Sequence, residues 1–199
     1  MTPHGKLFNP AESHRLESPD RPKYMPADEL VSRLRITPGM SIADIGAGTG
    51  YFALPLARAA TPGKVYAVDL QPEMLEKLRA KLASADAPTN IELMQGSAVQ
   101  TNLLSHSCDI ALIANVWHEL DGYDDTLREI ARILKPHGRL AILDWRPDVT
   151  HPPGPPLDHR IAMDSVRESV ENEGWTCHSA EPFGTYSYLV IAEPNAVAP

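Results

Sequence analysis

The sequence has only two cysteines, Cys108 and Cys177. A small domain held together by disulfides needs more of them, and low cysteine usage is typical of reducing compartments. No apolar run approaches the roughly 20 residues that cross a bilayer. The first residues are polar and include Pro3 and Pro10, unlike the apolar core of a secretion signal. We therefore expect a cytoplasmic protein without disulfides and without membrane insertion.

Positive charge is also scarce. The chain has 18 lysines and arginines against 26 aspartates and glutamates, which gives a formal net charge of −8. Binding to nucleic acid needs clustered cations, and here the basic residues are scattered, so a small-molecule partner is favoured. The 199 residues, 43% of them hydrophobic, suffice for one domain with a full core. The oligomeric state stays open.

The most informative segment is 42–50, with the sequence IADIGAGTG. Apolar residues lead into an acid, three glycines alternate with small residues, and a helical pattern follows. A strand that turns into a helix through glycines lets a ligand approach bare backbone. Asp69 ends the next expected strand, about 20 residues later, where such folds present a carboxylate to a ribose. The pattern predicts a site for a nucleoside-containing cofactor.

The spacing of the glycines distinguishes between cofactors. A dinucleotide fingerprint reads G-x-G-x-x-G, whereas this chain reads G-x-G-x-G with Asp44 two residues before Gly46. A carboxylate beside the turn would repel a pyrophosphate, but it suits a ligand with an amino group. S-adenosylmethionine carries an ammonium, a sulfonium and a ribose, and no phosphate. The alternative is an ordinary tight turn in which the acids only cap backbone amides.

Strands and helices alternate along most of the chain. The expected strands are 40–45, 65–69, 91–95, 109–115 and 140–144, then 176–182 and 186–192. The expected helices are 28–34, 51–60, 72–83, 124–134 and 158–173, with a short one at 10–17. The alternation predicts an α/β fold, a Rossmann-like, doubly wound, seven-stranded sheet that is mostly parallel. The last two strands are too close in sequence for a crossover, so they should form an antiparallel hairpin, which disfavours an NAD domain.

Four segments together resemble the motifs of class I S-adenosylmethionine-dependent methyltransferases. They are 43–50 (ADIGAGTG), 65–75 (VYAVDLQPEML), 109–120 (DIALIANVWHEL) and 128–140 (REIARILKPHGRL). The chain is similar to small-molecule members of the family, including ubiquinone-biosynthesis and arsenite-methylating proteins. Arsenite chemistry generally relies on several cysteine ligands, and two are present here. The match runs from about Thr37 to Trp145, and we expect one cofactor-binding domain over 37–199. The segment before it, 1–36, with Phe8, Tyr24 and Met25, is expected to form a helical lid over the cofactor, and a frayed tail packed elsewhere is the alternative.

The resemblance also implies which residues hold S-adenosylmethionine. They are Asp44, Gly46, Gly48, Gly50, Asp69, Leu70, Ser97, Ala98 and Asn115. Asp44 corresponds to the acid that contacts the amino end of the methionine moiety, and Asp69 to the acid that binds both ribose hydroxyls. Leu70 should pack on the adenine, and Asn115 corresponds to the end of the fourth strand, where the backbone meets the methionine moiety. Ser97 occupies a position where the family often has an aspartate.

Ligands of such sheets bind at the carboxyl ends of the strands, so the acceptor should lie over the exits of the fourth and fifth. The expected pocket residues are Tyr24, Trp117, Glu119, Asp144, Trp145 and Arg146. His118 is the candidate general base because its ordinary pKa is near neutrality. The alternative is that His118 and Glu119 only cap the next loop, since methyl transfer can proceed by positioning alone.

The proline-rich segment 151–156 should wall the pocket because it is too stiff for a free linker. Its flanking histidines, His151 and His159, have no fixed ligand spacing, so no metal site is expected. We therefore predict a methyltransferase that acts on a small molecule. A cofactor-binding regulatory module without turnover remains the alternative, and an NAD-dependent oxidoreductase is less favoured.

Overall fold

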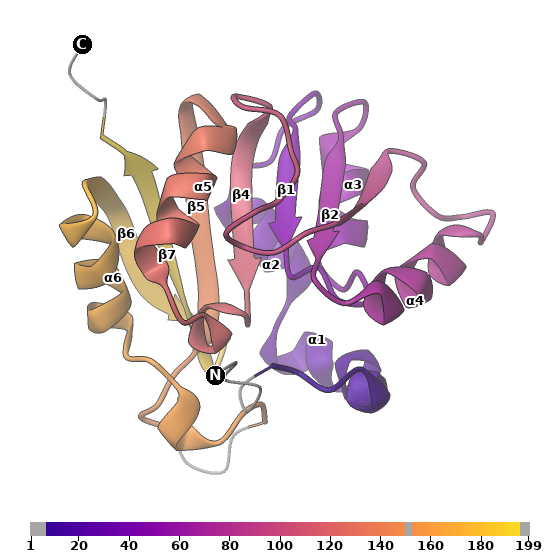
Figure 1. Ribbon diagram of the computed structural model, residues 1–199. Helices are drawn as coiled ribbons and strands as arrows, with labels where there is room; N and C mark the ends of the chain where they lie inside the picture. Colours follow the sequence, from indigo (N-terminus) through magenta and orange to yellow (C-terminus); the bar gives the residue numbers. More distant parts are fainter. Residues whose placement is uncertain (1–6, 150–152, 196–199) are drawn as a thin grey trace.

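The structure is a computed structural model that describes residues 7–149 and 153–195. Its centre is one seven-stranded sheet in the order β3-β2-β1-β4-β5-β7-β6 (Figure 1). The strands are β1 (Ile42–Ile45), β2 (Val65–Asp69), β3 (Ile91–Gln95), β4 (Cys108–Ala114), β5 (Leu134–Trp145), β6 (Trp175–Phe183) and β7 (Ser187–Pro194). Within the described residues, β7 runs antiparallel to both of its neighbours, β5 and β6, and the other strand pairs are parallel. The predicted fold class, including the terminal hairpin, is confirmed.

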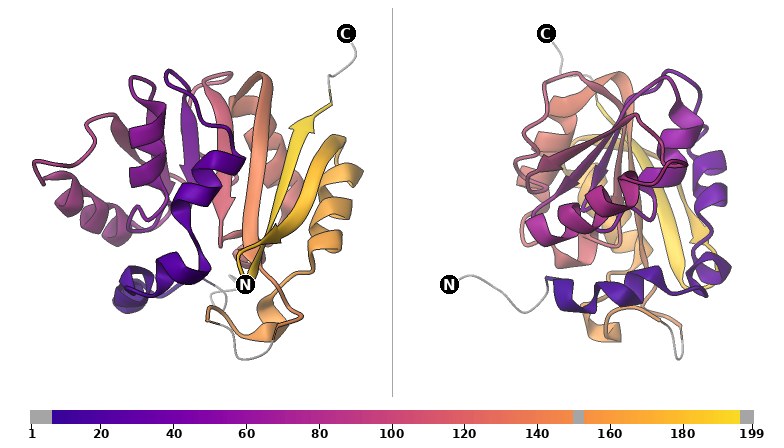
Figure 2. Two further views of the ribbon diagram at one scale, coloured as in Figure 1. Left: turned by 180° about the vertical axis from the view of Figure 1, so that it is seen from behind. Right: turned by 90° about the vertical axis from the view of Figure 1, so that its right-hand side faces the viewer.

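Helices cover both faces of the sheet (Figures 1 and 2). They are η1 (Pro10–Glu17), α1 (Arg21–Tyr24), α2 (Ala27–Arg33), α3 (Ala53–Ala60), α4 (Pro72–Leu82), η2 (Trp117–Glu119), α5 (Tyr123–Ile133), η3 (Leu157–His159) and α6 (Met163–Asn172), the η elements being 3-10 helices. Apolar side chains of α2 and α3 pack on one face, and those of α5 and α6 pack on the other.

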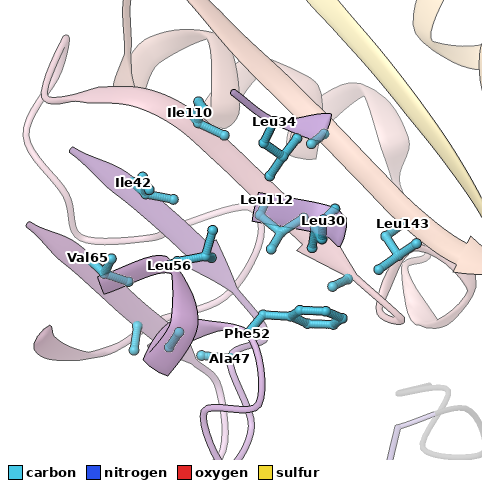
Figure 3. Close-up of a cluster of buried hydrophobic side chains, with 14 of the residues drawn as sticks. Leu30, Leu34, Ile42, Ala47, Phe52, Leu56, Val65, Ile110, Leu112 and Leu143 are labelled. Carbon is cyan, nitrogen blue, oxygen red and sulfur yellow. The ribbon is translucent and has the colours of Figure 1, made fainter. Parts of the chain in front are cut away.

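The apolar pattern of the sequence explains the core. Strand β1 is buried at every position and β4 at nearly every one, as central parallel strands with both faces covered must be. Figure 3 shows Ile42 and Leu112 from these strands packed with Leu30 of α2 and Leu56 of α3. Met25 belongs to the same buried cluster. Met25 thus belongs to the core together with α2, and Tyr24 packs against the same cluster.

Most element boundaries agree with the expectation to within two residues, and two differ more. Strand β5 begins at Leu134 instead of residue 140, because α5 passes directly into extended chain and Leu134 already pairs with Cys108. The expected helix 158–173 is divided into η3 and α6. It breaks at Arg160, whose backbone is extended and whose guanidinium binds carbonyl groups of the preceding loop.

The carboxyl ends of the parallel strands point to one end of the molecule. Figure 1 shows the N-terminal segment with η1 and α1, in indigo, beyond this end, together with the orange connection from β5 to α6. Strand order reverses between β1 and β4, and such a reversal is where open α/β sheets bind ligands. Across residues 7–149 and 153–195, no helix has the length and apolar character needed to cross a membrane.

Candidate active site

A cavity of about 1160 Å3 lies at the carboxyl ends of β1, β2 and β4. The loop from β1 to α3 forms its floor, residues 7–24 contribute side chains from one side, and residues 153–156 form a wall. The predicted site residues that line it are Asp44, Gly46, Gly48, Asp69, Leu70, Ser97, Ala98, Asn115, His118, Glu119, Tyr24 and Trp145. The fold therefore brings together most of the residues that the sequence pattern selected.

The three glycines of the loop have different tasks. All three have positive φ angles, +73° at Gly46, +54° at Gly48 and +86° at Gly50, a region that side chains rarely adopt. A Cβ on Gly46 would overlap Val116, and one on Gly50 would overlap Leu78. A Cβ on Gly48 would meet only a Leu16 methyl, at 3.6 Å. Gly46 and Gly50 are thus needed because their neighbours leave no room for a side chain. Gly48 leaves the cavity floor free of side chains.

Asp69 supports this loop directly. Its Oδ2 accepts a hydrogen bond from the Gly48 amide at 2.7 Å, and its Oδ1 accepts one from the Gln71 amide at 2.9 Å. Burial raises the pKa of Asp69, and these two amides oppose the shift. A carboxylate has about four lone-pair sites, so two remain for hydroxyl groups in the cavity.

Two exposed apolar side chains flank Asp69. Leu70 is 51% exposed and Val99 is 49% exposed, and both line the cavity. Ser97 and Ala98 lie beside Val99, and the Ser97 backbone is engaged with Gln100 in an isolated bridge. Val99 was not among the residues predicted from the sequence, although an apolar residue directly after Ala98 is a usable signal. Together these side chains offer a partly apolar surface next to the Asp69 carboxylate.

Asp44 is a buried acid with an unpaired oxygen. Its side chain is 2% exposed, and within the described residues Oδ2 has no hydrogen-bond partner. Burial and the nearby charge of Asp69 raise the pKa of Asp44 to about 7, against opposing effects of Arg21 and the Ala53 amide. Asn115, at the end of β4, likewise has an unpaired buried Oδ1 in that part of the chain. Two unsatisfied acceptors on adjacent strands fit a ligand group with several N–H donors, such as an ammonium.

His118 and Asp144 form a buried pair. His118 Nδ1 lies 2.8 Å from Asp144 Oδ1, and the His118 and Trp145 amides also donate to this carboxylate. Because an acceptor faces Nδ1, the neutral ring carries its proton there and leaves Nε2 with a lone pair. Nε2 lies 3.9 Å from Glu119 Oε1. The pair can therefore hold an imidazole base in a fixed orientation.

The charges around His118 raise its pKa. Burial lowers the pKa of His118, but the hydrogen bond and charge of Asp144, together with Glu119, outweigh it, and the net shift is upward. Burial raises the pKa of Glu119 to about 7, although the charge of His118 and the Phe8 amide oppose the shift. Glu119 consequently changes protonation near neutral pH, where a general acid or base works best, and the pKa of His118 lies above its ordinary value.

Three residues expected in the acceptor pocket do not line the cavity. Trp117 is fully buried and stacks on Tyr123 with ring centroids 4.6 Å apart. Asp144 is 1% exposed and lies behind His118. Arg146 pairs with Asp148 at 2.7 Å. Trp117 is therefore part of the core, Asp144 supports the base and Arg146 belongs to the surface.

Polar contacts connect the N-terminal segment, residues 7–24, to helix α4 and to the glycine loop. Glu17 pairs with Lys81 at 2.6 Å and also bonds Thr49. Further along, Gln71 Nε2 donates to the Phe8 carbonyl at 2.8 Å. These polar contacts could not be predicted from the sequence, because residues 7–24 show no apolar periodicity that indicates which side faces the rest of the fold.

The proline-rich wall is held by Arg160 and Trp145. The Arg160 Nη2 donates to the Pro153 carbonyl at 2.7 Å, and its guanidinium lies 5.3 Å from the Trp145 ring. Gly154 approaches the same ring so closely that a Cβ would come within 2.8 Å of it. Residues 153–156 and His159 line the cavity as expected, whereas His151 lies outside the described residues.

A family model described as a methyltransferase domain matches residues 43–142. The chain belongs to this family. The match and the sheet order together assign it to the class I S-adenosylmethionine-dependent methyltransferases. The residues that match include Asp44, the glycine loop, Asp69 and His118, so the cavity described above is built largely from the family's common part.

Individual relatives agree with this assignment. A demethylmenaquinone methyltransferase from Lactococcus lactis is 34% identical over 117 residues, 58% of this chain and 46% of that protein. An uncharacterised methyltransferase from Mycobacterium tuberculosis is 37% identical over 123 residues, 62% of this chain and 46% of that protein. The chain thus spans about half the length of these curated relatives. A crystal structure of a SAM-dependent methyltransferase from Aquifex aeolicus is 27% identical with a TM-score of 0.88, and the match covers 94% of this chain and 98% of that one.

Proposed function

We propose that this methyltransferase-family protein transfers a methyl group from S-adenosylmethionine to a small-molecule acceptor. The observation that carries the proposal is the unpaired, buried Asp44 oxygen that lines the cavity, with the unpaired Asn115 oxygen nearby. An ammonium satisfies both acceptors, whereas a pyrophosphate would be repelled by Asp44 and Asp69. Leu70 and Val99 then border the adenine, and Asp69 accepts from the ribose hydroxyls.

The acceptor would occupy the part of the cavity next to His118, Tyr24 and Trp145. At about 1160 Å3, the whole space is slightly larger than the usual small-molecule site, which leaves room for an acceptor beside the cofactor. Aromatic side chains and prolines in its wall favour a flat, largely apolar molecule. The similarity to a demethylmenaquinone methyltransferase supports a quinone-biosynthesis-like branch of the family, which we propose on that ground alone.

In this proposal the cofactor supplies a methyl group already activated by a sulfonium. The chain's own residues then have three tasks: Asp44, Asp69 and Asn115 hold the cofactor, the walls exclude water, and His118 Nε2 takes the proton that the acceptor loses. Asp144 keeps Nε2 turned toward the cavity. In the same proposal residues 7–24, which contribute to the cavity lining, act as a lid within the N-terminal segment 1–36.

Calorimetry and a turnover screen would test the function. We expect S-adenosylmethionine and S-adenosylhomocysteine to bind and NAD not to bind. Incubation with labelled S-adenosylmethionine and a panel of phenols, quinols, amines and thiols should yield a methylated product. Cofactor binding without transfer to any acceptor would instead support a regulatory module, and binding of NAD alone would overturn the proposal.

Asp69→Ala should weaken S-adenosylhomocysteine binding by about 1.5–3 kcal/mol, because it removes a charged acceptor for two hydroxyls. Part of the loss should come through the loop, since the Gly48 amide loses its partner as well. Calorimetry measures the affinity, and Asp86→Ala at an exposed position is the matched control. Unchanged binding in the folded Asp69→Ala variant would show that the ribose does not lie at this carboxylate.

Asp44 should make cofactor binding depend on pH. Its carboxylate must ionise to pair with an ammonium, and its pKa in the ligand-free protein is about 7. The affinity for S-adenosylhomocysteine should therefore rise roughly five- to tenfold from pH 6 to pH 7.5, since a pKa unit corresponds to a tenfold change. Asp44→Asn should bind weakly with a flatter profile across this range.

Glu119→Gln separates this effect from the second carboxyl of the cavity that titrates near neutrality. It should retain the rise in affinity between pH 6 and pH 7.5. If the rise disappears in Glu119→Gln and persists in Asp44→Asn, the ammonium lies near Glu119 and the orientation of the cofactor is reversed.

A further inference from the structure

Arg21 is a buried cation that lines the same cavity as Asp44. It is 8% exposed, its Nη1 donates to the Leu16 carbonyl at 2.8 Å, and its guanidinium stacks on the Tyr51 ring at 4.0 Å. Arg15, another arginine of the cavity lining, differs because it is largely exposed and pairs with Glu12. Arg21 is thus held rigidly at the cavity by packing and one hydrogen bond.

The guanidinium of Arg21 keeps unused donors. It has five N–H groups, and within residues 7–149 and 153–195 only the bond to Leu16 is formed, with no ion pair to any carboxylate. Burial lowers the pKa of Arg21, and the charges of Tyr51, Tyr24, Glu17 and Asp44 act against this shift. A buried, partly unsatisfied guanidinium is costly unless a ligand completes its hydrogen bonds.

Arg21 and Asp44 approach the same point of the fold. Asp44 accepts from the Ala53 amide, the first residue of α3, and Arg21 lies over the rings of Tyr51 and Phe52 just before that helix. Each residue therefore borders the start of α3, one with negative charge and the other with positive charge. The pair is complementary to a ligand that carries an ammonium and a carboxylate on neighbouring atoms.

We propose that Arg21 binds the α-carboxylate of the cofactor and so makes the site selective for the complete amino acid. This inference rests on the proposed function. The methionine end of S-adenosylmethionine is a zwitterion, and the acceptors of Asp44 and Asn115 that suit its ammonium would repel its carboxylate. A cation close to Asp44 removes that conflict, and Arg21 presents a planar fork that matches a carboxylate.

Arg21 and Asp44 belong to different parts of the fold. Arg21 belongs to α1, within the segment 7–24 that lines one side of the cavity, whereas Asp44 belongs to the sheet. A carboxylate bound by Arg21 and an ammonium bound by Asp44 would therefore connect the segment to the sheet through the ligand. Ligands that lack the carboxylate should connect residues 7–24 to the sheet less tightly.

The test compares two ligands in two proteins. The ligands are S-adenosylhomocysteine and its decarboxylated analogue, in which hydrogen replaces the carboxylate, and the variant is Arg21→Met. Wild-type protein should bind S-adenosylhomocysteine roughly 10- to 100-fold more tightly than the analogue, as expected for a charge-assisted pair. Arg21→Met should lose most of this difference, with little change in the affinity for the analogue. Arg21→Lys should restore part of it, and Arg128→Met, at an exposed arginine outside the cavity lining, should behave as wild type.

The affinities of the two ligands distinguish carboxylate binding by Arg21 from a purely structural role. Equal losses for both ligands in Arg21→Met would mean that Arg21 only supports the cavity, and no loss would mean that the carboxylate lies elsewhere; both overturn the inference. If Arg21→Met does not fold, the wild-type comparison still decides, because equal affinity for the two ligands contradicts carboxylate recognition. Failure of wild-type protein to bind S-adenosylhomocysteine would overturn the proposed function, and this inference with it.

Discussion

A Gly48→Asn variant should fold as the wild-type protein does and yet bind no S-adenosylhomocysteine that calorimetry can detect. Position 48 has a φ angle of +54°, and asparagine is among the few side chains that tolerate this region. The backbone amide that bonds Asp69 is retained. Since a Cβ at this position meets only a Leu16 methyl, the new side chain enters the cavity from its floor. We expect the affinity to fall by more than about 100-fold, which is more than about 2.7 kcal/mol.

Gly46→Ala and Gly50→Ala provide the contrast within the same loop. Their methyl groups would overlap Val116 and the buried Leu78, so the expected effect is on stability, about 1–3 kcal/mol for overpacking. For a chain of this length, each kcal/mol lowers the melting temperature by roughly 2–4 °C. Thermal unfolding and calorimetry should therefore separate Gly48→Asn from the other two variants. Normal cofactor affinity in folded Gly48→Asn would mean that the ligand does not pass over this loop.

The different roles of these glycines could not be read from the sequence. The pattern G-x-G-x-G predicts a turn that leaves backbone bare, and the structure has such a turn. Which glycine faces the ligand depends on residues far away in the chain, Val116 after β4 and Leu78 in α4. The strands themselves were predictable, because long apolar runs such as β4 are typical of central parallel strands.

The roles of the residues predicted for the acceptor pocket likewise depend on the folded structure. The sequence locates Asp144 and Trp145 at the exit of one strand but does not determine which faces the ligand. Successive side chains of a strand point to opposite faces, and here Trp145 lines the cavity while Asp144 lies behind His118. Arg21 was not predicted because it begins the four-residue helix α1 in a proline-rich segment, which is too short for a periodicity that identifies a buried side.

His118→Ala should lower the rate of methyl transfer by roughly 10²–10⁴ while the affinity for S-adenosylhomocysteine changes little. The reason is geometric: Nε2 belongs to a residue that lines the cavity, and Nδ1 is held by Asp144 at 2.8 Å. A base works in its unprotonated form, so the wild-type rate should rise with pH through a midpoint above 6.5, the ordinary histidine pKa, because the pKa of His118 is raised. Initial rates with an acceptor from the turnover screen measure both effects.

Asp144→Asn distinguishes a base from a residue that merely orders the loop. Removing this charge leaves burial to lower the pKa of His118, so the midpoint of the pH–rate profile should move to lower pH and the maximal rate should fall. Loss of structure alone would lower the rate without moving the midpoint. A flat profile between pH 5 and pH 8, together with an active His118→Ala variant, would contradict the base role. Catalysis would then depend on how the cavity positions the acceptor, as an in-line displacement from an activated methyl group allows.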